Sequence, residues 1–77
     1  MRKPEEPSVE TITAALVYLM SHYAQTGCPR LAICVGRHMQ CLALHPDAPP
    51  VLRDICAGLH GAWAEAGRGP QRNTPVH

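Results

Sequence analysis

The stretch that decides the fold is Cys28–His45, CPRLAICVGRHMQCLALH, the most apolar run of the chain. Its large apolar residues recur every three or four positions, which is the spacing of one face of an α-helix. We therefore predict a helix over about 29–45 whose centre line packs into a hydrophobic core. The residues of this centre line are Leu31, Val35, Met39 and Leu42.

The ends and the middle of this stretch fit the same helix. Pro29 suits a first helical turn, because the N–H that proline lacks would have no partner there. His45 precedes Pro46 and should end the helix, since a residue before proline avoids the helical conformation. Gly36 lies mid-helix, where glycine costs about 1 kcal/mol relative to alanine. A glycine at that place is consistent with close packing of a neighbouring helix.

A second helix is predicted before this stretch, over about 9–25. Ser8 is a good N-cap, and Glu10 puts a negative charge in the first turn, where the helix dipole favours it. Gly27 is placed to end the helix in a left-handed C-cap. The residues expected to face the core are Val9, Ile12, Leu16, Leu19, Met20 and Tyr23.

A third helix is predicted after the stretch, over about 49–66. Asp47 is the expected N-cap, with Pro49 and Pro50 in the first turn. Gly67 is the expected stop. The apolar face expected to be buried consists of Val51, Leu52, Ile55, Leu59, Ala62 and Trp63.

Three helices joined by short turns pack as antiparallel neighbours, so the predicted fold is an all-α, up-down-up three-helix bundle. The predicted domain is 8–66, with a flexible lead at 1–7 and a disordered tail at 67–77. A chain this short buries only about 60% of its unfolded surface. Domains of this size often need a metal, disulfides or a partner copy. The thin core therefore favours a homodimer.

Composition and motifs narrow the function. The net charge is +1 and 17% of the residues are charged, which argues against a basic nucleic-acid surface. The chain has no nucleophile elbow and no glycine-rich phosphate loop, so we predict no catalysis and no small-molecule substrate. Helix-turn-helix DNA binding is a further alternative, because three short helices also form that fold. Its recognition face would include Arg53, Asp54 and His60.

Neither a membrane span nor a secretion signal is predicted. Charged residues, Arg30 and Arg37 among them, interrupt the apolar stretch. The start, MRKPEEPSVE, carries Glu5 and Glu6 where a signal peptide would be apolar. We expect a cytoplasmic protein whose thiols stay reduced.

Cysteine and histidine repeat four residues apart in this chain. Residues at this spacing lie one above the other on a helix, so a Cys-x3-His pair has a geometry that can chelate a metal. Two antiparallel helices could each give one pair to a Cys2His2 zinc site. A fold at the 46–48 turn would bring the first pair level with the third. The pairs are Cys34/His38, Cys41/His45 and Cys56/His60.

Ordinary packing competes with zinc as the explanation of the same pattern. A free cysteine often behaves as a small buried hydrophobe. Cys56 lies at the edge of the predicted apolar face of the 49–66 helix, and His60 lies nearly opposite that face. We therefore predict no metal, and keep a zinc-binding or thiol-based sensor, using Cys34, His38, Cys56 and His60, as the alternative function.

The remaining feature is a second apolar patch on the 29–45 helix. Ile33 and Leu44 lie opposite the predicted core line. A helix that is apolar on two sides is usually covered on both. We predict that this side contacts a protein partner or a second copy, so that the chain is a small, self-associating helical interaction module. The predicted contact residues are Ile33, Arg37, Gln40 and Leu44.

Overall fold

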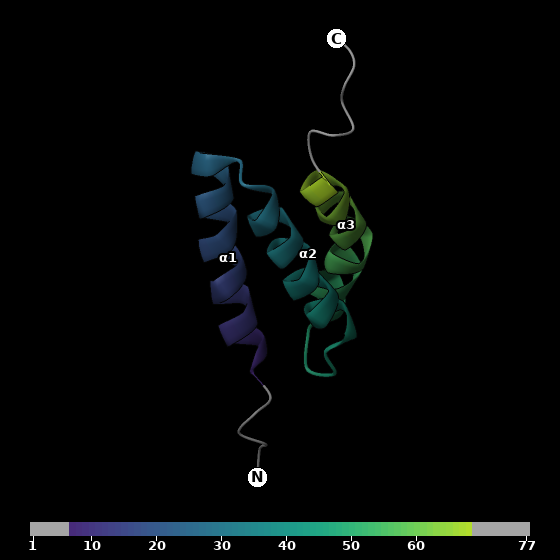
Figure 1. Cartoon of the computed structure of the whole chain (residues 1–77). Coiled ribbons are helices and arrows are strands. Elements are labelled where there is room, and N and C mark those ends of the chain that lie inside the picture. Colours follow the sequence, from purple (N-terminus) through teal and green to yellow (C-terminus); the bar gives the residue numbers. More distant parts are fainter. Residues whose placement is uncertain (1–6, 69–77) are drawn as a thin grey trace.

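A computed structural model of the chain describes residues 7–68, which form three α-helices joined by short turns. Figure 1 shows the chain running up, down and up again. The predicted all-α three-helix architecture is confirmed, and the predicted helix boundaries lie within two residues of those observed. The helices are α1 (Val9–Thr26), α2 (Pro29–Leu44) and α3 (Pro50–Arg68).

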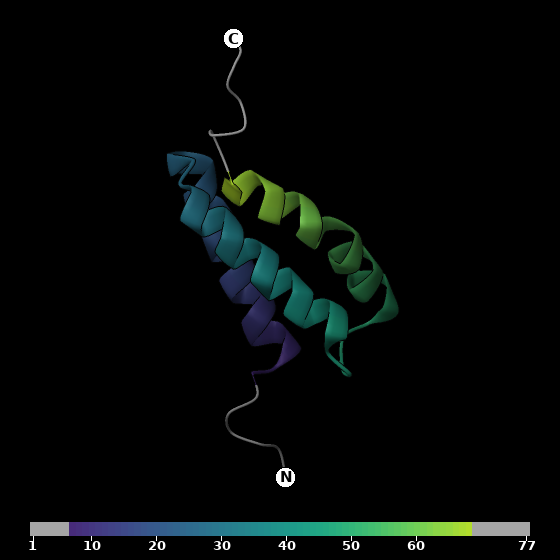
Figure 2. The same cartoon turned by 45° about the vertical axis from the view of Figure 1, so that its right-hand side comes forward.

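The central element is α2, which lies between α1 and α3 (Figures 1 and 2). Both outer helices pack mainly on α2, and they contact each other far less than they contact it. One aromatic pair joins the outer helices near their C-terminal ends. The rings of Tyr23 and Trp63 meet edge to face, with centroids 5.3 Å apart. The bundle is therefore organised around α2 rather than around three equal interfaces.

The predicted start and end of α1 and the predicted start of α2 are confirmed. The Thr11 N–H donates to the Ser8 hydroxyl at 3.1 Å, which makes Ser8 the N-cap of α1. Gly27 ends α1 with a φ of 66°, the left-handed conformation that glycine adopts without strain. Its N–H donates to the Tyr23 carbonyl at 2.7 Å. Pro29 then opens α2 at its first position.

The core is built where α1 and α3 meet α2. The predicted centre line of α2 is largely confirmed, because Val35, Met39 and Leu42 are buried, while Leu31 is half-buried. The large or sulfur-containing side chains of the core cluster are Ile12, Leu16, Val35, Met39, Leu42 and Cys56.

Close packing at Gly36 is also confirmed. A Cβ at this position would lie 3.1 Å from the carbonyl oxygen of His60 and 3.4 Å from the Cβ of Trp63. Gly67 on α3 leaves even less room, because a Cβ there would overlap the side chain of Ile33 on α2. Glycines at these two places bring the backbones of α2 and α3 close together.

The predicted buried face of α3 is only partly correct, because the helix is rotated about its axis relative to the prediction. Leu52 and Trp63 pack against the core as predicted. Val51, Ile55 and Leu59 were expected in the core, yet they are 70%, 51% and 44% exposed. Cys56, expected at the edge of the buried face, is 2% exposed and is the buried residue of this helix. His60, expected nearly opposite, is half-buried, with its backbone against Gly36. The side of α3 that carries small side chains packs on α2, because small side chains permit the closest approach of the two backbones.

The predicted N-cap of α3 is wrong as well. The helix begins at Pro50, and its first bond runs from the Arg53 N–H to the Pro49 carbonyl at 2.9 Å. Pro49 therefore stands at the N-cap position. Each proline disfavours a helical residue before it, so two in a row delay the start of the helix. Asp47 instead lies exposed in the turn, and its N–H donates to His45.

The predicted stop of α3 at Gly67 is also wrong, since the helix runs through Gly67 to Arg68. The glycine serves close packing against Ile33 and adopts no left-handed cap. The predicted lead and tail lie outside the described residues, except for Pro7 at the lead and Gly67 and Arg68 at the tail.

Substitutions at two glycines test the α2–α3 contact. We expect Gly36→Val to lower the free energy of unfolding by about 1–3 kcal/mol, because the added atoms press on backbone that cannot move freely. Gly61→Ala should raise it by up to about 1 kcal/mol, since alanine is the better helix former and nothing lies within 4 Å of a Cβ there. Urea unfolding followed by circular dichroism measures both. A Gly36→Val protein as stable as wild type would contradict the close approach.

Candidate functional site

The four predicted contact residues of α2 share one exposed face. Their positions are four, three and four residues apart, which keeps them on one side of the helix. All four are exposed, and Leu44 is the most open at 76%. Ile33 is 41% exposed, because it lies against Gly67 of α3. We call this surface the α2 row; it consists of Ile33, Arg37, Gln40 and Leu44.

A second exposed surface lies on α3 and was not predicted as one. Val51, Ile55 and Leu59 recur every four residues, so they form one continuous line along the helix. Ala62 continues this line and is also exposed. We call these four residues the α3 stripe.

The α3 stripe runs beside the part of α3 that packs on the core. Leu52 and Trp63, which neighbour the stripe on the helix surface, are half-buried against the core cluster. The apolar surface of α3 therefore extends past the contact with α2. A signal for this was present in the sequence, because the apolar residues of α3 spread over a wide arc of the helix surface and a neighbouring helix need cover only part of it.

The cysteines of the three Cys-x3-His pairs lie in different surroundings. Cys34 and Cys41 are exposed on α2, whereas Cys56 is buried between α2 and α3. His38 donates from Nδ1 to the Cys34 carbonyl at 2.7 Å, so that ring nitrogen is bound to its own helix. Within residues 7–68 no three Cys, His, Asp or Glu side chains are grouped so as to hold a metal ion. Zinc binding through Cys34, His38, Cys56 and His60 therefore stays an untested alternative, and this geometry does not favour it.

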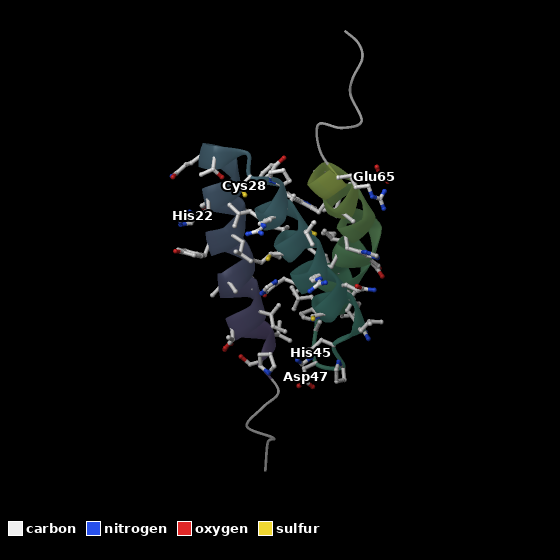
Figure 3. The ribbon with its side chains drawn as sticks, in the orientation of Figure 1. His22, Cys28, His45, Asp47 and Glu65 are labelled. Carbon is white, nitrogen blue, oxygen red and sulfur yellow. The ribbon has the colours of Figure 1, made fainter. Side chains whose placement is uncertain are left out.

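His45 has a structural position at the end of α2. Its Nδ1 accepts a hydrogen bond from the Asp47 N–H at 3.0 Å, and its Nε2–H donates to the Pro7 carbonyl at 3.2 Å. Figure 3 shows His45 and Asp47 together at the turn between α2 and α3. An open pocket of about 680 Å³ lies here, between this turn and the first turn of α1. The histidine thus ties the start of the described chain to that turn.

The predicted DNA-recognition face is only partly exposed. Arg53 and His60 are half-buried, while Asp54 is exposed. Arg68, the basic residue in the last turn of α3, pairs with Glu65 at 2.8 Å. These positions give α3 no basic row of the kind that tracks a phosphate backbone.

Comparison of the chain with protein-family models, with curated proteins and with solved structures found no match. Among the helices of the described residues, none is long and apolar enough to cross a membrane. The function must therefore be argued from the chemistry of the exposed surfaces, and the apolar α3 stripe is the most distinctive of them.

Thiol labelling tests which face of α3 is buried. Burial raises the pKa of the Cys56 thiol, which lowers the share of reactive thiolate. We expect iodoacetamide to modify Cys34 and Cys41 at least about a hundredfold faster than Cys56, since the buried thiol reacts only after the structure opens. Peptide mass spectrometry against time gives the rates, and all cysteines should react together in urea. Equal rates for Cys34 and Cys56 in the native protein would show that Cys56 is not buried and would contradict the observed rotation of α3.

Replacing His45 tests the tie between the chain start and the turn. We expect His45→Ala to lower the free energy of unfolding by about 1 kcal/mol, because two partly exposed hydrogen bonds are lost. His22→Ala is the control, since His22 is exposed and its described contact is with the Tyr18 ring on the same helix. Thermal unfolding of both variants at one pH makes the comparison. Equal stabilities would show that the His45 bonds contribute nothing.

Proposed function

We propose that the chain is a small helical protein-interaction module that self-associates, and we assign no catalysis to it. The observation that carries this proposal is the exposure of the α3 stripe, in which Val51, Ile55 and Leu59 keep 70%, 51% and 44% of their surface open. Isolated exposed apolar residues are ordinary, but a continuous line of them marks a contact surface.

The energetic argument supports association of modest strength. Full burial of a valine, leucine or isoleucine side chain contributes about 1.5–3 kcal/mol relative to exposure. The stripe residues are half-open already, and association itself costs several kcal/mol in lost freedom of motion. We therefore expect a dissociation constant in the micromolar range rather than a permanent assembly.

The α2 row belongs to the same proposal as a second contact surface. Leu44 stands at its end with 76% of its surface open, and Arg37 and Gln40 supply hydrogen-bond donors beside it. Large exposed apolar residues flanked by polar ones resemble the centre and rim of a protein contact. A cytoplasmic location remains part of the proposal.

Sedimentation equilibrium of the wild-type chain tests self-association directly. The mass of one chain is 8.4 kDa. We expect the average mass to rise toward twice that value as concentration increases from low micromolar to several hundred micromolar. Substituting both surfaces, as Leu44→Glu with Ile55→Glu, should hold the protein at the monomer mass. A wild-type mass that stays at that of one chain over the whole range would rule out self-association.

A further inference from the structure

We propose that the second copy binds through the α3 stripe, in an antiparallel pairing of α3 with α3 of the other copy about a twofold axis between Gly58 and Leu59. This inference rests on the proposed function and specifies its surface, its partner and its geometry. It follows from three observations: what remains of the chain to cover the stripe, how side-chain size changes along it, and where glycine occurs in α3.

The segments of this chain do not offer a cover for the stripe. Helix α1 packs on α2 and reaches α3 mainly through the Tyr23–Trp63 contact. The residues outside the described range are MRKPEE and GPQRNTPVH. Apart from prolines, their apolar side chains are Met1 and Val76. Neither segment has the apolar spacing needed to lie along a helix, so neither is the occupant proposed for the stripe.

Side-chain size along this flank of α3 falls from its N-terminal to its C-terminal half. Val51, Ile55 and Leu59 are large, whereas Gly58, Ala62 and Ala66 are small. A twofold axis between Gly58 and Leu59 pairs each large residue with a small one. Alternating large and small residues across a contact allows close packing. The facing pairs are Val51 with Ala66, Ile55 with Ala62, and Leu59 with Gly58, each taken from opposite copies.

A parallel arrangement does not have this match. Twofold-related parallel helices set each residue beside its own copy. Ile55 would then meet Ile55 and Gly58 would meet Gly58, leaving crowding at one end and voids at the other. The antiparallel pairing is the one in which the surface is complementary to itself.

The position of Gly58 supports the pairing independently. Glycine is the weakest helix former apart from proline, so a glycine inside a helix usually has a packing reason. Gly36 and Gly67 have theirs in the close α2–α3 contact. At Gly58 and Gly61, in contrast, no atom of the described chain lies within 4 Å of a Cβ position. Of these two, Gly58 lies on the side of α3 that bears the stripe, three residues from Ile55 and four from Ala62. If Leu59 of a second copy packs on Gly58, the absence of a side chain at this position is explained by that contact.

The size of the contact sets its strength. From Val51 to Ala66 the paired length is about 22 Å, at 1.5 Å per helical residue. One helix pair of this length lies at the small end of specific protein interfaces. The dimer is therefore reversible, in line with a regulated or transient contact.

Sedimentation equilibrium of single-surface variants is the first test. Ile55→Glu should raise the dimer dissociation constant at least about tenfold, because it buries a charge opposite Ala62. Val17→Glu, at an exposed apolar residue of α1 outside both surfaces, is the matched control and should leave the constant unchanged. If Leu44→Glu abolishes the dimer and Ile55→Glu does not, the proposed function stands and this inference is overturned. A wild-type chain that remains monomeric overturns both, and leaves a different protein as the occupant of the stripe.

Gly58→Gln separates loss of contact from loss of folding. The site is open within its own chain, and glutamine is a better helix former than glycine. We expect a variant with a higher unfolding midpoint than wild type, measured at low micromolar concentration, and a dissociation constant at least about tenfold weaker. A Gly58→Gln protein that dimerises as wild type does would overturn the seating of Leu59 on Gly58.

Disulfide trapping fixes the direction of the pairing. In a background of Cys28→Ser, Cys34→Ser and Cys41→Ser, which leaves the buried Cys56, one cysteine is introduced at a time. Leu59→Cys lies beside the axis and should cross-link two copies under mild oxidation. Val51→Cys should not, because its two copies are about 22 Å apart along the antiparallel helices, against a limit of about 7 Å between the Cα atoms of a disulfide. Equal cross-linking of both variants shows a parallel pair and overturns the proposal.

Discussion

At Gly36 the backbones of α2 and α3 approach so closely that a Cβ would lie 3.1 Å from the His60 carbonyl oxygen. The contact at Gly67 holds the other end of the same interface. Together they decide how α3 is rotated on α2. Cys56 turns into the core, and the larger residues Val51 and Ile55 turn outward. An interface made from small residues thus determines which large ones are left for other contacts.

Much of the fold was predictable because its signals are local. Ser8 and Gly27 have cap geometries that a few neighbouring residues determine, and Pro29 opens α2 for reasons confined to its own turn. The rotation of α3 was not predictable in this way. Apolar spacing identifies an arc of a helix, but only the shape of the neighbour decides which part of a wide arc is covered.

The candidate surfaces show the same division. The exposure of the α2 row was foreseen, because Ile33 and Leu44 lie opposite a narrow and well-marked core line. The α3 stripe is predicted as core from the sequence, since a buried face and an exposed apolar face have the same sequence pattern. Gly58 is the residue whose sequence could have raised doubt, because a glycine beside large aliphatic residues suggests a second close neighbour. The cysteine–histidine spacing, in contrast, suggested a shared metal site. Spacing along one helix carries no information about how that helix is rotated relative to its neighbour, so it could not show that the pairs do not meet.

The contact between Tyr23 and Trp63 has a practical consequence. Trp63 is the single tryptophan of the chain, and it lies where α1 meets α3. The fluorescence of its indole therefore depends on how α1 packs against α3. Separation of α1 from α3 would move the tyrosine ring away and let water reach the indole. Emission from this one chromophore then follows the packing at this end of the bundle, where Trp63 contacts both α1 and the core, while helical dichroism follows the molecule as a whole.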